Sequence, residues 1–194
     1  MNTNLTEIVI IIDKSGSMGH LSNDVVGGIN TFIQEQKKLE GDVNLSMILF
    51  DGNIEHKYDR IKLSEVNDLT LSDYRPCGST SLYDAIGFTT SHIGSKLNDT
   101  PENDRPSKVL FAIMTDGEDN TSKEYTAQKI KEIIDHQTSK YSWEFLFMAA
   151  NIDVDATAKS IGIANTLAFT ADSVGTRCLY DSLNSYTVNY RSSK

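Results

Sequence analysis

Asp13, Ser15 and Ser17 are the residues whose types and spacing most suggest chemistry. They alternate along the loop Asp13-Lys14-Ser15-Gly16-Ser17. In an extended loop, alternate side chains point the same way, so one carboxylate and two hydroxyls can converge on one point. Hard oxygen donors with little negative charge suit Mg²⁺ or Mn²⁺. The same residues could instead cap a following helix, so the loop by itself leaves two interpretations open.

The elements around this loop predict an α/β fold. The β-branched run at residues 8–12 directly precedes Asp13 and is typical of a strand buried on both faces. Further apolar runs predict strands at residues 43–50, 108–115, 143–150 and, more weakly, 166–169. Helical periodicity between them predicts helices at about 21–39, 82–97 and 125–134, a short helix ending near 160, and a last helix from about 172. Alternating strands and helices indicate a doubly wound, mostly parallel sheet with helices on both faces, in a single domain spanning residues 1–194.

Two segments depart from this simple alternation. Asp51-Gly52 is a hairpin turn signal, and the polar, alternating run at 54–61 predicts an antiparallel edge strand. Residues 62–80 show no periodicity, and long connections of this kind are usually functional or mobile. Within the first helix, Gly27 and Gly28 are expected to let the backbone lie close to the sheet.

Composition excludes several partners. The net charge of -9 and the lack of Lys/Arg blocks argue against binding nucleic acid or an anionic membrane. The chain shows no secretory leader and no apolar run long enough to span a membrane, so we expect a soluble, cytoplasmic protein. Cys77 and Cys178 are expected to be free thiols.

Two more loops bring oxygen donors toward the Asp13 loop. Asp116 follows the strand predicted at 108–115, and Thr80 leads into the helix predicted at 82–97. In open parallel sheets, ligands bind beyond the carboxyl ends of the strands, near the point where the strand order reverses. Asp13, Asp116 and Thr80 are therefore expected at one edge of the sheet.

With these three pieces in order, the sequence closely resembles the von Willebrand factor A (VWA) family and its metal-ion-dependent adhesion site (MIDAS). The family pattern Asp-x-Ser-x-Ser, then a Thr before a later helix, then an Asp after the fourth strand, matches Asp13, Ser15, Ser17, Thr80 and Asp116. The resemblance implies a Rossmann-like VWA fold and a divalent metal, usually Mg²⁺, with Mn²⁺ or Ca²⁺ as alternatives. It further implies a non-enzymatic module that binds an Asp or Glu carboxylate of a protein partner through that metal.

The resemblance is greatest to stand-alone bacterial or phage members of the family. It implies a setting such as a bacterial stress response or a phage assembly, in the cytoplasm or a phage particle. It selects neither the partner nor the oligomeric state.

Two other functions compete with this one. A metal-dependent phosphohydrolase would use Asp13 as nucleophile, as in phosphatases of the haloacid dehalogenase class. Members of that class have a second acid two residues later, where this chain has Ser15. A purely structural or scaffold protein would use the metal only to brace the loops. The motifs of P-loop nucleotide enzymes and of Gly-x-Ser-x-Gly hydrolases do not occur.

Five polar residues near the loops have simpler interpretations than metal binding. We expect Lys14 to place its charge in solvent and His20 to lie near a helix start. The negative charges of Glu118 and Asp119 are expected to stabilise the N-terminus of the next helix. Asp153 is expected to cap the helix that begins near Ala156. The tyrosines of the last helix are expected to pack in the core: Tyr180, Tyr186 and Tyr190.

Overall fold

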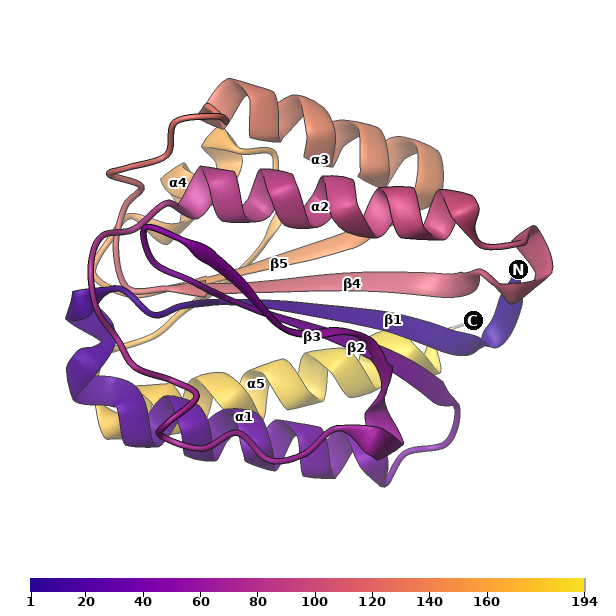
Figure 1. Cartoon of the computed structure of the whole chain (residues 1–194), viewed down its shortest axis with the longest axis horizontal. Coiled ribbons are helices and arrows are strands. Elements are labelled where there is room, and N and C mark those ends of the chain that lie inside the picture. Colours follow the sequence, from indigo (N-terminus) through magenta and orange to yellow (C-terminus); the bar gives the residue numbers. More distant parts are fainter. Residues whose placement is uncertain (194) are drawn as a thin grey trace.

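A six-stranded sheet lies between two layers of helices (Figure 1). The computed structural model describes residues 1–193. The strands are β1 (Asn2–Asp13), β2 (Asp42–Phe50), β3 (Ile54–Lys62), β4 (Pro106–Thr115), β5 (Glu144–Ala149) and β6 (Asn165–Ala168). The α-helices are α1 (Ser22–Lys37), α2 (Leu82–Asp99), α3 (Ala127–Tyr141), α4 (Val154–Ser160) and α5 (Ser173–Ser192). Short 3-10 helices cover Gly16–Leu21, Leu63–Glu65 and Glu102–Asp104.

The strand order is β3-β2-β1-β4-β5-β6. All neighbouring pairs are parallel except β2 and β3, which are antiparallel and place β3 at the edge. This confirms the predicted doubly wound, mostly parallel sheet with one antiparallel edge strand. The chain winds from β1 to one side through β2 and then to the other side through β4. The strand order therefore reverses between β1 and β4, where a ligand site is expected.

Both faces of β1 are covered, which explains its continuous apolar run. Ile8, Ile10 and Ile12 belong to the core beneath α1 and α5. Val9 and Ile11 belong to the core beneath α2, α3 and α4. Figure 1 shows α1 and α5 side by side on one face, with α2 and α3 on the other. A strand buried on both sides needs apolar residues at every position.

The connection after β3 is anchored to the core. Leu63, Val66, Leu69 and Tyr74 are buried in the same core as α1. Asn30 of α1 also pairs with the backbone of Leu69, accepting from its N–H at 2.7 Å and donating to its carbonyl at 2.9 Å. Residues 63–74 therefore form a strap that packs over α1, although their sequence shows no clear helix or strand periodicity.

One of the two adjacent glycines of α1 serves a contact between helices, which corrects the expectation that both let the backbone approach the sheet. A Cβ built at Gly28 would lie 2.1 Å from a ring carbon of Tyr180 in α5. At Gly27 the same atom would meet nothing within 4 Å. Only Gly28 is thus required by packing, because α1 and α5 cross closely there.

The remaining expectations about single side chains can be checked directly. Cys77 and Cys178 are free and exposed, as predicted. Tyr180 is buried in the core, as predicted. Tyr190 is only half-buried, and its hydroxyl bonds to the backbone of Val109 in β4. Tyr186 packs against the core beneath α5. Within residues 1–193, no helix has the length and apolar character needed to cross a membrane.

Candidate metal centre

The first loop of the candidate site begins where β1 ends. Asp13 is fully buried, and its Oδ1 accepts a hydrogen bond of 2.7 Å from the N–H of Ser15. This side-chain-to-backbone bond turns the chain sharply after the strand. It brings Ser15 and Ser17 together, with their Oγ atoms 3.1 Å apart.

Asp116 joins the same cluster from the end of β4. The Ser17 hydroxyl donates to Asp116 Oδ1 at 2.7 Å, although the two residues are 99 positions apart. Asp116 is nearly buried, whereas Ser17 is exposed. The sheet order explains the contact, because β1 and β4 are parallel neighbours whose carboxyl ends meet.

Thr80 reaches this edge through backbone hydrogen bonds on both sides. The Gly16 N–H donates to the carbonyl of Gly78 at 3.2 Å, which ties the Thr80 segment to the first loop. On the other side, Thr80 and Asn120 exchange two bonds of 3.0 Å, one through the Asn120 side chain. Within residues 1–193 the Thr80 hydroxyl makes no hydrogen bond. Thr80 is buried between the two loops.

The structure thus assembles all five predicted residues at one edge of the sheet. Hydrogen bonds that involve side chains connect Asp13, Ser15, Ser17 and Asp116. Thr80 is connected to the same loops through backbone hydrogen bonds of its segment. Whether they bind metal stays a prediction at this point.

Three supporting residues were not anticipated. Thr115 donates its hydroxyl to Asp13 Oδ2 at 2.6 Å, and the Tyr74 hydroxyl donates to the Asp13 carbonyl at 2.6 Å. Asn120 holds Thr80, as described above. Thr115 could have been suspected as the polar end of an apolar strand. Tyr74 lies in the aperiodic segment, where nothing in the sequence indicated a partner.

The electrostatics of the cluster favour a cation. Burial raises the pKa of the Asp13 carboxyl above its usual value, and the negative charge of Asp116 adds to this. The hydrogen bonds from Thr115 and Ser15 offset part of the increase. Among residues 1–193, no Lys, Arg or His forms a salt bridge with Asp13 or Asp116. Two carboxylates that share a buried site without a basic partner form a set into which a divalent cation fits.

Lys14 does not point freely into solvent, which corrects the expectation for this residue. Its ammonium lies 2.8 Å from Glu55 and 3.9 Å from Asp51, and its side chain is only 15% exposed. It therefore binds the first loop to the hairpin of β2 and β3. Asp51 is a turn residue as expected, accepting from the Asn53 N–H at 2.7 Å, and it is also buried.

The other polar residues near the loops have structural contacts. His20 lies in the 3-10 helix after the first loop, just before α1, and bridges the carbonyls of Ser17 and Ala171. Asp153 caps α4 by accepting from Ala156, as predicted. Asp119 differs from expectation, because it accepts from Tyr83 in the first turn of α2 and not from α3. Loops that meet in space can thus cap a helix that precedes them in sequence.

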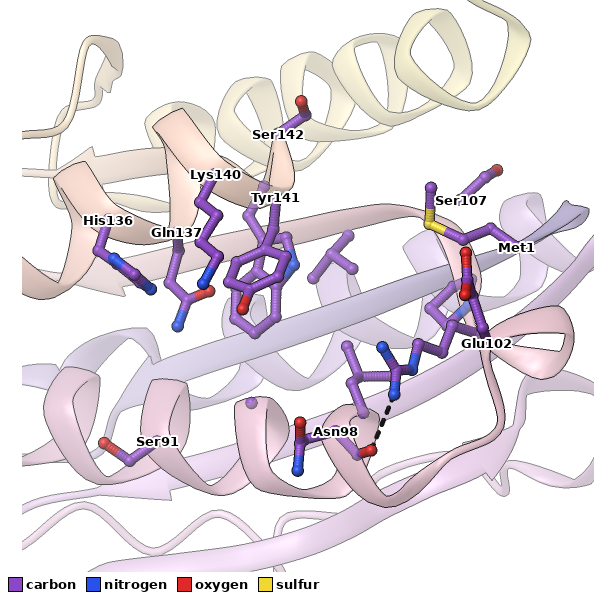
Figure 2. A pocket seen from close by; sticks show the side chains of 16 residues that line it. Met1, Ser91, Asn98, Glu102, Ser107, His136, Gln137, Lys140, Tyr141 and Ser142 are labelled. Carbon is purple, nitrogen blue, oxygen red and sulfur yellow. Dashed lines mark hydrogen bonds between the residues drawn. The ribbon is translucent and has the colours of Figure 1, made fainter.

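A separate cavity of about 520 Å³ lies at the opposite end of the sheet. Its lining includes Met1, Trp143 and residues of α2 and α3 (Figure 2). Arg105 also lines it and donates to the Asn98 carbonyl at 2.8 Å. The cavity lies where β4 and β5 begin, not where they end, so it shares no residue with the candidate metal centre.

Comparisons with known proteins identify the fold. No family model and no curated protein sequence matches the chain. Among solved structures it resembles proximal thread matrix protein 1 from the mussel byssus, described with a zinc-occupied MIDAS motif (TM-score 0.67, 12% identity). It also resembles a von Willebrand factor type A structure from Catenulispora acidiphila (0.63, 12%) and a D319A mutant of the PilB minor pilin from Streptococcus sanguinis (0.64, 9%).

These matches cover nearly the whole chain but only part of each neighbour. They include 94%, 93% and 96% of this chain, respectively, and 48%, 42% and 61% of the three proteins. At this level of identity the comparison concerns architecture alone. The chain has the α/β fold of its von Willebrand factor A structural neighbours.

Proposed function

We propose that this chain is a metal-dependent protein-interaction module. Asp13, Ser15, Ser17, Thr80 and Asp116 would hold a divalent cation, Mg²⁺ by preference, with Mn²⁺ or Ca²⁺ able to replace it. The observation that carries the proposal lies at the point where the strand order reverses. There, two carboxylates without a basic partner among residues 1–193 lie with the hydroxyls of Ser15 and Ser17, and backbone hydrogen bonds hold Thr80 beside them. The zinc-occupied MIDAS described for the mussel protein, which shares this fold, supports a divalent metal.

The five residues would contribute to metal binding in different ways, according to their charge and exposure. Ser15 and Ser17 would bind the metal directly through neutral oxygens, and Thr80 directly or through water. Asp13 and Asp116 would supply the negative charge and orient the hydroxyls. Ser17 is the exposed member of the set, so the open coordination position would face solvent beside it.

The partner proposed for that position is an Asp or Glu carboxylate on another protein. A metal held mainly by neutral oxygens keeps enough positive charge to attract an anionic ligand. We place the module in the cytoplasm or in a phage particle, within a bacterial stress response or a phage assembly.

The phosphohydrolase alternative has less support from the geometry. Both carboxylate oxygens of Asp13 are engaged, one by the Ser15 N–H and the other by the Thr115 hydroxyl. A nucleophile needs a free oxygen directed toward substrate. His20, the nearest imidazole in sequence, contacts the Ser17 carbonyl and not its hydroxyl, so it is not placed to activate that serine.

The test is capture of a bead-displayed peptide library that varies acidic residues, with Mg²⁺ or with EDTA. We expect Mg²⁺-dependent capture of peptides that present a carboxylate, and loss of capture when the carboxylate is amidated. Asp13→Ala should abolish capture, whereas Ser64→Ala, an exposed serine in the strap, should not.

Three outcomes would count against the proposal. Capture that survives both EDTA and Asp13→Ala would exclude a metal-mediated contact. Asp13-dependent turnover of a generic aryl phosphate would favour the enzyme. Strong thermal stabilisation by Mg²⁺ without any capture would favour the scaffold role.

A further inference from the structure

A second group of metal-ligating side chains lies on the outer flank of the sheet, away from the candidate metal centre. His56 and Asp59 belong to the edge strand β3, and His92 belongs to α2. The potential ligand atoms of the three residues all lie within 4.8 Å of one another. The His92 Nε2 and the Asp59 Oδ1 are 3.0 Å apart, and the rings of His56 and His92 meet edge to face with centroids 5.0 Å apart.

The backbone of β3 is irregular at the position that creates this group. In a regular strand, residues three apart point to opposite faces, so His56 and Asp59 would not share a side. Here Ile48 pairs with His56 while Met47 pairs with Tyr58, which leaves one extra residue in β3. This β-bulge reverses the alternation and turns Asp59 to the same side as His56.

A second bulge follows and restores the core contacts. Leu45 pairs with Ile61 and Met47 with Tyr58, so β3 again carries one residue more than β2. Arg60, within this second bulge, has a φ of 52°, which is uncommon for a residue other than glycine. As a result Tyr58 and Ile61 pack on the core of α1 while His56 and Asp59 face α2.

The surrounding charges leave the group available to a cation. The ammonium of Lys57 is paired with Asp73, and the guanidinium of Arg60 is paired with Glu7. Among residues 1–193, Asp59 forms a salt bridge with His92 alone. Asp59 and His92 are about one-third exposed, so an ion can reach them from solvent.

We propose that His56, Asp59 and His92 form a second metal site, selective for a borderline transition ion of the Zn²⁺ class. Two imidazoles and one carboxylate are ligands typical of such ions, whereas Mg²⁺ and Ca²⁺ require oxygen ligands. Tetrahedral ligands at about 2.0 Å from Zn²⁺ lie about 3.3 Å from one another, close to the separation of His92 and Asp59. Small side-chain rotations bring His56 into the same shell.

The ion would join the edge strand to a helix. β3 has only β2 as a strand neighbour, and a metal bridge to α2 would fix its outer side. Water would complete the coordination. This proposal rests on residues that the proposed MIDAS does not use, so either proposal can fail without the other.

The experiment titrates Zn²⁺ into the full chain carrying Asp116→Ala, which disables the first site. A Ser17→Ala background repeats the measurement in case Asp116→Ala disturbs folding. Long-range ¹H–¹⁵N spectra follow the four imidazoles, His20, His56, His92 and His136. We expect the rings of His56 and His92 to shift at one equivalent of Zn²⁺ while His20 and His136 stay unchanged.

Matched variants give the second readout. His92→Gln or His56→Gln should weaken Zn²⁺ binding by more than about tenfold, because loss of a ligand costs at least as much as loss of an outer-shell partner. We also expect Zn²⁺ to raise the melting temperature of the Asp116→Ala chain, and His92→Gln or His56→Gln should abolish this rise. His136→Gln should change neither the Zn²⁺ affinity nor the rise in melting temperature. Unchanged affinity in His92→Gln and His56→Gln, or shifts confined to His20 and His136, would overturn the proposal.

Discussion

Both carboxylate oxygens of Asp13 are fixed by the protein itself. The Ser15 N–H holds one oxygen and the Thr115 hydroxyl holds the other, at 2.7 and 2.6 Å. Hydrogen-bond partners of this kind hold a metal-binding carboxylate in position when no metal is bound, so less conformational free energy is lost on metal binding. Thr115 is therefore a positioning residue for the proposed site, although it is not one of the five proposed ligands.

The first prediction concerns this hydroxyl. Thr115→Val keeps the shape of the side chain but removes the donor to Asp13. We expect Mn²⁺ affinity, measured by electron paramagnetic resonance, to fall by about 10- to 100-fold, as for other outer-shell partners. Thr31→Val, an exposed threonine of α1, is the control and should leave affinity unchanged. Equal affinity in Thr115→Val and the native chain would show that the hydroxyl has no positioning role.

At the scale of elements, the contact between α1 and α5 depends on one glycine. Gly28→Ala would force a methyl into the ring of Tyr180, and overpacking of this kind typically costs about 1–3 kcal/mol. Gly27→Ala adds a methyl in open space and should stabilise the helix by about 0.5–1 kcal/mol. Urea denaturation of the two single variants measures both effects. Equal effects of the two substitutions would contradict the packing account.

The order of the elements was predictable because it depends on local patterns. Buried strands produce continuous apolar runs, and the helices of both layers produce 3.6-residue periodicity. Asp13 and Asp116 could be placed at one edge because each directly follows such a strand. Parallel strands end on the same side.

Contacts between distant segments could not be predicted in the same way. The strap at residues 63–74 is buried by α1, yet its apolar residues follow no period. Lys14 pairs with Glu55, and Asp119 caps α2, only because the fold brings their loops together. Gly28 lies against Tyr180, which is more than 150 positions later in the chain, and no local sequence pattern indicates such a contact.

At the scale of the whole molecule, a buried ion pair ties β1 to β3 across β2. Glu7 is fully buried, accepts from the Arg60 Nε at 3.0 Å, and lies 3.4 Å from the Asn44 amide. Burial raises the pKa of Glu7 above 4.5, and Arg60 offsets only part of the increase. The folded protein therefore keeps this proton to a higher pH than the unfolded chain does.

The sign of the pH effect follows from that difference. As the pH rises from about 4.5 through the folded pKa, the unfolded chain releases the proton first, so the free energy of unfolding falls. Glu7→Gln cannot titrate, so its stability should increase relative to the native chain over that interval and then level off. Urea denaturation at a series of pH values tests this. A stability difference that is constant or falls with pH would contradict the assignment.

The proposed metal site requires the loops after β1 and β4 to hold a divalent cation together with Thr80. The most direct measurement is a crystal structure of the full chain grown with Mn²⁺, with anomalous scattering recorded for manganese. We expect a peak within bonding distance of Ser15 Oγ and Ser17 Oγ, beside Asp13, Thr80 and Asp116, and no such peak in crystals of Asp116→Ala. A fully occupied manganese peak elsewhere, with none between these loops, would contradict it.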